Sequence, residues 1–263
     1  MKSALNLLLV LALGWSLSAC DTNPIKESFS SSAEDLDDVG EPREDRPGDV
    51  YAQMGQGYLK EGQPGVALRK LKRGLEVDPN NSRVHVVLGN LYDSLGETEA
   101  AENHYRRSLQ LAPRNPYYHN ALGSFLCKRE RYPEAEEEFQ LAIQSPMYPT
   151  PWAALTNSGV CAYRAGNIPQ AETNLQRALT ANPQIPQALL KLAQIRFDQG
   201  DSARAKEYLD RYQRVAPPAP EGLWLAIRIE RALGNQKVAG RYQAELKKRF
   251  PDAPENQLAK ESK

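Results

Sequence analysis

The chain has 263 residues, 41% of them apolar, so it contains enough apolar material to bury a core. Lys and Arg together number 33, and so do Asp and Glu, which gives a formal net charge of zero. This balance excludes a global electrostatic attraction to nucleic acid or to an anionic membrane surface, so partners must be selected by local shape and chemistry.

Residues 1–19 have the pattern of an export signal. Lys2 supplies a positive charge, residues 5–13 are nearly all apolar, and Leu17-Ser18-Ala19-Cys20 follows. The apolar run is much shorter than the roughly 20 residues that a transmembrane helix needs, which favours a signal peptide. Small residues before a Cys resemble the lipobox of bacterial lipoproteins; the alternative is a chance Cys after an ordinary signal peptide. We expect Cys20 to be lipidated and to anchor the protein in a membrane through its acyl chains.

Residues 20–47 predict a lipidated Cys followed by a flexible acidic linker. From Asp21 to Pro47 there are nine acidic residues against Lys26, Arg43 and Arg46, and Ser and Pro are frequent. Such a composition cannot bury enough apolar surface to fold. We interpret the segment as a tether.

After the linker the sequence repeats with a period of about 34 residues, which is typical of helical repeat proteins. A proline ends most of the units: Pro79, Pro113, Pro183, Pro217 and Pro251. The third unit is two residues longer, and we place the extra residues in the loop from Ser145 to Pro151. The predicted units are 48–81, 82–115, 116–151, 152–185, 186–219 and 220–253, and residues 254–263 form a C-terminal tail.

Each unit resembles the tetratricopeptide pattern, in which small residues at the eighth and twentieth positions let two helices approach closely. In the second unit the matching residues are His85, Leu88, Gly89, Tyr92, Ala101, Tyr105 and Pro113. A glycine lies between the two helices of five units, at Gly62, Gly96, Gly166, Gly200 and Gly234, and Glu130 takes this place in the third. We predict an all-α fold, an α-solenoid of about six tetratricopeptide (TPR) helical hairpins forming a right-handed superhelix.

The sequence contains no convergent set of catalytic residues. His85 and His119 occupy a position where the repeat places a core side chain, so we interpret both as structural. There is no His/Cys cluster with metal-ligand spacing, no phosphate-binding loop and no nucleophile elbow. We therefore expect a binding protein and not an enzyme, with no cofactor, no metal, no small-molecule substrate and no nucleic acid partner.

Cys127 and Cys161 lie on the predicted first helices of neighbouring units. In an oxidising periplasm they would form a disulfide between the two units, at about 3 to 4 kcal/mol of stabilisation from loop entropy. The alternative is two buried free thiols on helices that are out of register.

The concave side of a solenoid is lined by first-helix positions two, five, nine, twelve and thirteen, so candidate partner contacts can be read from the sequence. Aromatic and Arg side chains are common anchors of protein interfaces, while apolar residues there can instead pack within the array. The predicted contact residues are Ala52, Gln56, Leu59, Val86, Asn90, Asp93, Tyr117, Asn120, Tyr163, Arg164, Phe197, Trp224, Arg228 and Arg231.

Three short stretches carry a more specific resemblance: His119–Cys127 (HNALGSFLC), Tyr148–Pro151 (YPTP) and Asn157–Ala162 (NSGVCA). With them the chain resembles, from about Asp49 to Pro251, the type IV pilus biogenesis and stability lipoproteins of the PilF/PilW pilotin family. The resemblance implies a lipoprotein at the periplasmic face of the outer membrane that helps the pilus secretin to reach that membrane and to form multimers. It also implies that Cys127 and Cys161 pair.

One residue disagrees with this location. Asp21 follows the expected lipidated Cys, and in enteric bacteria an Asp there favours retention at the inner membrane. We nevertheless expect the outer membrane. The alternative function is a general periplasmic adaptor for cell-envelope assembly or cell-wall enzymes, whereas an enzymatic function would need a further domain that the tail is too short to supply.

Overall fold

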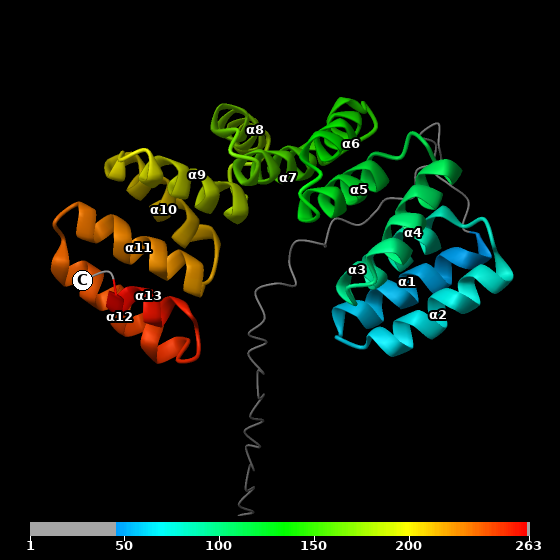
Figure 1. The fold of residues 1–263 in the computed structure, drawn as a ribbon, viewed down its shortest axis with the longest axis horizontal. Coiled ribbons are helices and arrows are strands. Elements are labelled where there is room, and N and C mark those ends of the chain that lie inside the picture. Colours follow the sequence, from blue (N-terminus) through cyan, green and yellow to red (C-terminus); the bar gives the residue numbers. More distant parts are fainter. Residues whose placement is uncertain (1–45, 262–263) are drawn as a thin grey trace, which may run out of the picture. The chain divides into compact units, whose positions relative to one another are not determined.

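The structure is a computed structural model of the chain and describes residues 46–261. Within these residues the only regular secondary structure is α-helical, which confirms the predicted fold class (Figure 1). The helices are α1 (Pro47–Lys60), α2 (Pro64–Val77), α3 (Ser82–Ser94), α4 (Thr98–Leu111), α5 (Pro116–Lys128), α6 (Tyr132–Gln144), α7 (Pro151–Arg164), α8 (Ile168–Ala181), α9 (Pro186–Asp198), α10 (Ser202–Val215), α11 (Pro220–Ala232), α12 (Gln236–Arg249) and α13 (Glu255–Glu261).

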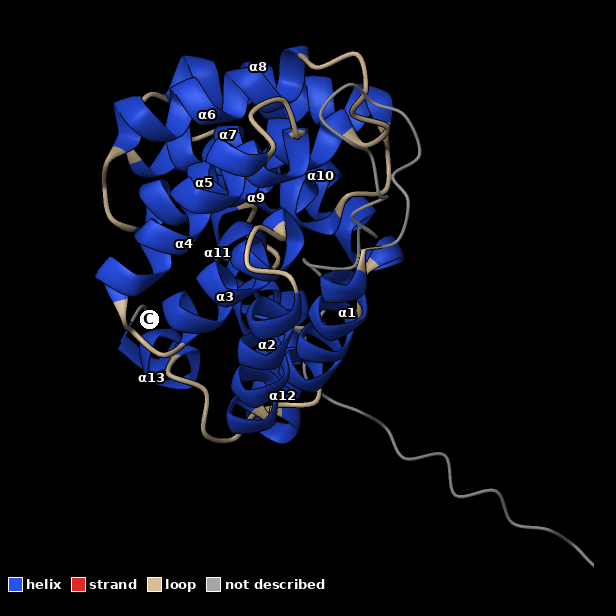
Figure 2. Cartoon of the chain, turned by 90° about the vertical axis from the view of Figure 1, so that its right-hand side faces the viewer, coloured by secondary structure: helices blue, strands red, loops and turns tan. Residues whose placement is uncertain are grey.

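Helices α1 to α12 form six helical hairpins that stack in chain order, which is a solenoid arrangement. Short loops join the helices (Figure 2). Each first helix packs against both helices of the hairpin before it, so neighbouring first helices contact one another along the array. The second helices pack mainly against the first helices of their own and the following hairpin. We call the solvent-facing surface of the first helices α1, α3, α5, α7, α9 and α11 the inner face.

The helix boundaries follow from local chemistry. Asn81 and Asn115 cap α3 and α5, because their side chains accept hydrogen bonds from the backbone N–H groups of Val84 and Tyr117. Eight helices begin with a Pro in the first turn, where its missing N–H is not needed: α1, α2, α5, α6, α7, α8, α9 and α11. These signals set where each helix of the array begins.

The turn inside each hairpin requires a left-handed backbone conformation. All five glycines predicted for these turns have a positive φ, between 71° and 82°. Glu130 takes the same conformation with a φ of 60°, as the third hairpin lacks a glycine at this place. The left-handed region is costly for a residue with a Cβ, so Glu130 is the least favourable of the six turn residues.

Close contact between the two helices of a hairpin depends on glycine in the first helix and a bulky residue in the second. A Cβ added at Gly123 would lie 2.8 Å from the Phe139 ring, and one at Gly89 would lie 2.8 Å from the Tyr105 ring. Phe139 is completely buried. The large side chain therefore occupies the space that the glycine leaves free.

Two segments differ from the sequence prediction. Helix α7 begins at Pro151, one residue before the predicted unit, after a loop in which the buried Tyr148 packs edge-on against Tyr117 at 5.0 Å between ring centroids. The predicted tail instead contains α13, which contacts α11 and α12. Its buried Ala259 packs with Leu223. This helix covers apolar surface of the sixth hairpin.

We predict that Gly123→Ala lowers the free energy of unfolding by about 1 to 3 kcal/mol, since the new methyl group would overlap the Phe139 ring. The matched control is Gly240→Ala in α12, where an added Cβ meets nothing within 4 Å. This control should gain about 0.5 to 1 kcal/mol through its higher helix propensity. Urea denaturation followed by circular dichroism measures both, and equal effects would contradict the packing argument.

Candidate functional site

The inner face is the candidate functional site, and the structure divides the predicted contact residues by exposure. Ala52, Val86 and Tyr117 are buried, at 0%, 8% and 8% exposure, so their prediction as partner contacts is wrong. They pack in the core cluster shared by the first four hairpins. Arg164 is exposed, and the remaining predicted residues are partly exposed: Gln56, Leu59, Asn90, Asp93, Asn120, Tyr163, Phe197, Trp224, Arg228 and Arg231.

In the first three hairpins the inner face carries mainly amide side chains whose positions are held by hydrogen bonds. The Tyr105 hydroxyl donates to Asn90 Oδ1 at 2.7 Å. Asn157 Nδ2, which was not among the predicted contact residues, donates to Asn120 Oδ1 at 3.0 Å and so joins the third and fourth hairpins. Two cations of this region share one carboxylate, because Asp93 accepts from Lys128 at 2.8 Å and from Arg129 at 2.9 Å.

In the last three hairpins the inner face carries a different set, which we call the ring–cation cluster: Tyr163, Lys191, Phe197, Asp198, Trp224 and Arg228. The Lys191 ammonium lies 4.6 Å from the centroid of the Tyr163 ring. The Arg228 guanidinium lies 4.4 Å from the Phe197 centroid and 5.9 Å from the Trp224 centroid. Lys191 of α9 covers the Tyr163 ring of α7, and Arg228 of α11 covers the Phe197 ring of α9. The cluster therefore joins α7, α9 and α11.

Asp198 is the acceptor at the centre of this cluster. Its carboxylate accepts from the Tyr163 hydroxyl at 3.0 Å and from Gln194 Nε2 at 2.6 Å, and Arg228 lies 3.6 Å away. Burial, and then the hydrogen bond to Asp198, raise the pKa of Tyr163, which keeps this hydroxyl protonated as a donor. The sequence analysis named Tyr163, Phe197, Trp224 and Arg228 but missed Lys191 and Asp198.

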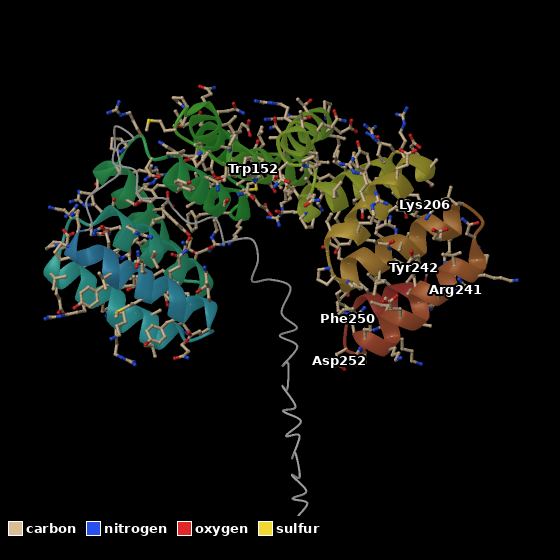
Figure 3. The ribbon with its side chains drawn as sticks, turned by 180° about the vertical axis from the view of Figure 1, so that it is seen from behind. Trp152, Lys206, Arg241, Tyr242, Phe250 and Asp252 are labelled. Carbon is tan, nitrogen blue, oxygen red and sulfur yellow. A yellow bond between two sulfur atoms is a disulfide. The ribbon has the colours of Figure 1, made fainter. Side chains whose placement is uncertain are left out.

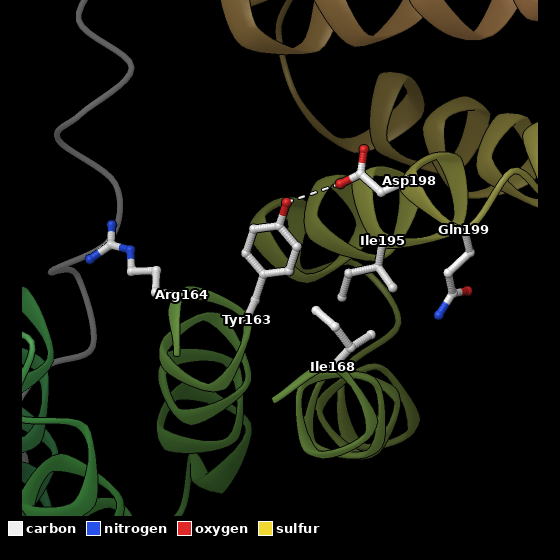
Figure 4. A pocket seen from close by; sticks show the side chains of 6 residues that line it. All are labelled: Tyr163, Arg164, Ile168, Ile195, Asp198 and Gln199. Atoms are coloured by element: carbon white, nitrogen blue, oxygen red, sulfur yellow. Dashed lines mark hydrogen bonds between the residues drawn. The ribbon is translucent and has the colours of Figure 1, made fainter. Parts of the chain in front are cut away.

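A hollow of about 450 Å³ opens beside the cluster, between the fourth and fifth hairpins. Its lining residues are Tyr163, Arg164, Ile168, Ile195, Asp198 and Gln199. Figure 4 shows Ile168 and Ile195 pointing toward each other from α8 and α9, with the Tyr163 hydroxyl reaching Asp198 across the opening. The hollow thus combines an apolar floor with a polar rim.

Ion pairs between consecutive hairpins fix the register of the first helices in this half of the array. Glu172 of α8 pairs with Arg196 of α9 at 2.9 Å. One repeat later the charges are exchanged, because Lys206 of α10, marked in Figure 3, pairs with the buried Glu230 of α11 at 2.8 Å. In both ion pairs the two residues are 24 positions apart in sequence. A comparison of equivalent positions in successive repeats could therefore have predicted both pairs.

A disulfide joins α5 and α7. Cys127 and Cys161 are bonded, with 5.8 Å between their Cα atoms and 34 residues between them in sequence. Both side chains are buried, so the bond lies in the interior behind the inner face. It connects the amide-rich half of the inner face with the half that carries the ring–cation cluster.

We predict that replacing both cysteines by Ala lowers the free energy of unfolding by about 3 to 4 kcal/mol, since the unfolded chain loses a constraint on a loop of this length. Urea denaturation with and without dithiothreitol measures the effect. The natural protein should lose stability in the reductant and the double variant should not respond to it. A natural protein that is insensitive to complete reduction, confirmed by thiol counting, would contradict the expectation.

The histidines have structural partners, as interpreted from the sequence. His119 Nδ1 lies 2.6 Å from Glu138 and its Nε2 lies 2.8 Å from the Pro113 carbonyl oxygen. His85 Nδ1 lies 2.9 Å from His104 Nδ1. Burial, and then the charge of His85, lower the pKa of His104 to about 4, and burial also lowers the pKa of His85.

This histidine pair predicts a loss of stability in acid. Between about pH 6.5 and pH 4 the unfolded chain binds more protons at His85 and His104 than the folded protein, so the free energy of unfolding should fall as the pH falls. His104→Gln should lose less stability than the natural protein between pH 7.5 and pH 4.5, as judged by urea midpoints. An equal loss in both proteins would assign the acid sensitivity to other groups, such as carboxylates.

Residues 46–261 lack two features that bear on function. In this part of the chain, no three His, Cys, Asp or Glu side chains converge in a way that would hold a metal ion. No helix there is both long enough and apolar enough to cross a bilayer. The features that the described chain does offer are an extended helical face, a disulfide and a ring–cation cluster, which suit the binding of another protein.

Sequence comparison defines the class of protein. Two family models described as tetratricopeptide repeat match the chain, one over residues 58–125 and one over residues 156–220 and 190–254. Neither description names an enzyme. The protein is therefore a tetratricopeptide-repeat protein, in agreement with its stacked hairpins.

More specific relatives follow from whole-chain comparisons. The type IV pilus assembly protein PilF of Pseudomonas aeruginosa is 27% identical over 256 residues, which span 97% of this chain and 96% of PilF. The crystal structure of PilW, a widely conserved type IV pilus biogenesis factor, matches with a TM-score of 0.75 and 31% identity, over 82% of this chain and 99% of PilW. The structure of P. aeruginosa PilF matches with a TM-score of 0.74 and 27% identity, over 82% and 98% of the two chains. The chain belongs to this family of type IV pilus biogenesis TPR proteins.

Proposed function

We propose that the protein is a lipid-anchored pilotin of the type IV pilus system. It binds the pilus secretin through the inner face of its TPR array, carries it to the outer membrane and promotes its assembly into multimers. The observation that carries this proposal is the similarity to PilF along nearly the whole of both chains, which extends beyond the repeats that TPR proteins share in general.

The mode of action is binding. The inner face runs along six consecutive first helices, so it can follow an extended segment of a partner over several hairpins. Partly exposed Tyr, Phe, Trp and Arg side chains provide anchors of the kind that dominate protein interfaces. In this function the protein orients its partner and performs no chemical step.

The anchor is the second element of the proposal. Cys20, the residue we expect to be lipidated, and Asp21, which would favour the inner membrane in enteric bacteria, both lie outside the described residues. Several acyl chains at about 0.8 kcal/mol per buried methylene would make attachment effectively permanent. The acidic stretch between Cys20 and α1 would then set the distance between the bilayer and the inner face.

Deletion of the gene should abolish surface pili and reduce the amount of secretin multimer in the outer membrane. The natural gene should restore both, whereas Cys20→Ser should leave the secretin subunits out of the outer membrane, because the carrier would lose its anchor. Density-gradient separation of membranes and immunoblotting of unheated samples measure location and multimers together. Arg177→Ser, an exposed α8 position outside the inner face, is the control and should behave as the natural protein.

Two results would contradict the proposal. Normal secretin multimers in the outer membrane of the deletion strain would exclude the pilotin function. Full complementation by Cys20→Ser, with the variant protein found free of membranes, would exclude delivery by a lipid anchor.

A further inference from the structure

The cations of the ring–cation cluster are positioned mainly by aromatic rings. Lys191 makes no ion pair with any described carboxylate, and it is positioned by the Tyr163 ring instead. Arg228 is positioned by two rings and forms a long ion pair, at 3.6 Å, with Asp198, whose carboxylate also accepts from Tyr163 and Gln194. In the first half of the inner face, by comparison, Lys128 and Arg129 both form ion pairs with one carboxylate, that of Asp93.

Arg164 adds a third cation at the edge of the hollow. Its side chain is exposed and forms no hydrogen bond or ion pair within the described residues. Figure 4 shows it pointing away from Ile195, with Tyr163 between its guanidinium and the apolar floor, so the guanidinium does not fill the hollow. An anion next to the hollow would meet this guanidinium without displacing another partner.

The anionic residues of the region do not cancel these cations. Asp198 accepts hydrogen bonds from Tyr163 and Gln194 and forms a long ion pair with Arg228, so its one charge is already engaged within the cluster. Glu221 lies close enough to Tyr163 to affect it electrostatically, but it is exposed and makes no ion pair among the described residues. The local charges are therefore three cations against two anions, and two of the cations, Lys191 and Arg228, are oriented on rings that restrict their motion.

The hollow adds a requirement of shape. Its floor is formed by Ile195, which is almost completely buried, and by the partly buried Ile168. A volume of about 450 Å³ is enough for one large apolar side chain together with part of its backbone. An all-polar segment would leave this apolar floor in contact with water, and so would gain less from binding here.

We propose that the ring–cation cluster and the adjoining hollow form a subsite for an acidic segment of a protein partner, in which one aliphatic or aromatic side chain enters the hollow and flanking carboxylates bind Lys191, Arg164 and Arg228. This proposal rests on the proposed function, in which the inner face is the binding surface. It adds that the last three hairpins select an acidic segment with one apolar side chain. The amide-rich first half would bind backbone or uncharged side chains of the same segment. Partner recognition is thus divided along the array.

A peptide library tests this without any knowledge of the partner. The chain from Asp21 to Lys263, which contains every described helix, is immobilised and used to select from a phage library of random 12-residue peptides. Selected peptides should be enriched in Asp and Glu around a central Leu, Ile or Phe. A synthetic copy of the best sequence is then measured by fluorescence anisotropy against the natural protein and its variants.

Lys191→Gln/Arg228→Gln should weaken binding of this peptide about tenfold, because two charge-assisted contacts are lost. The matched control is Lys247→Gln/Lys248→Gln, which removes the same net charge from two exposed positions of α12. This control should bind as the natural protein does, and both double variants should keep its urea midpoint. Replacing the peptide's carboxylates by amides should weaken binding to the natural protein and to the control, and should have a smaller effect on Lys191→Gln/Arg228→Gln.

Enrichment of basic or uncharged peptides would overturn the proposal, and so would equal weakening by the two double variants, which would reveal a general charge effect. A selected peptide whose binding is unchanged in Lys191→Gln/Arg228→Gln would place the acidic site elsewhere. These outcomes are independent of secretin assembly, which the deletion strain reports. The peptide experiment can therefore be interpreted even if the pilotin function is excluded. In the same way, the deletion strain can be interpreted even if the subsite is excluded.

Discussion

The contact between consecutive hairpins is the constraint on which the rest of the structure depends. A hairpin alone leaves one side of its first helix uncovered, and stacking on the preceding hairpin buries that side. Val84 of α3 packs against Gly74 of α2 in this way, and Gly222 of α11 packs against Tyr212 of α10. Because every first helix is placed by the hairpin before it, the inner face is a product of these interfaces.

Two kinds of bond reinforce this stacking where function needs a defined register. The Cys127–Cys161 disulfide holds α5 and α7 together, and the exchanged ion pairs hold α9 and α11 on the second helices before them. Removing one partner of the buried Lys206–Glu230 pair would leave a charge without compensation, so such a pair strongly disfavours a shift in register. The ring–cation cluster spans the same helices and requires the same register to bring Arg228 over Phe197.

The repeat made much of the fold predictable. Glycine and proline spacing predicted six hairpins, and the positive φ at Gly62 and at Glu130 confirms the placement of the turns. Features without repetition were missed, such as α13, whose seven residues have no counterpart in other units. Some first-helix positions that were predicted to line the inner face instead pack in the core between hairpins. Ala52 and Tyr117 are buried for this reason. Lys191 was missed because it lies over the Tyr163 ring of the preceding hairpin. The sequence prediction considered positions within one repeat and did not include contacts between repeats.

The central claim is that the inner face of the first helices binds the secretin. Hydrogen–deuterium exchange of the chain, with and without purified secretin subunits, tests this most directly because it reports every helix at once. If the inner face binds the secretin, amide exchange should slow in the first helices on binding, and most in α7, α9 and α11. The outer second helices α6, α8 and α10 should change little. Protection confined to the second helices, or no protection at saturating secretin, would contradict this claim.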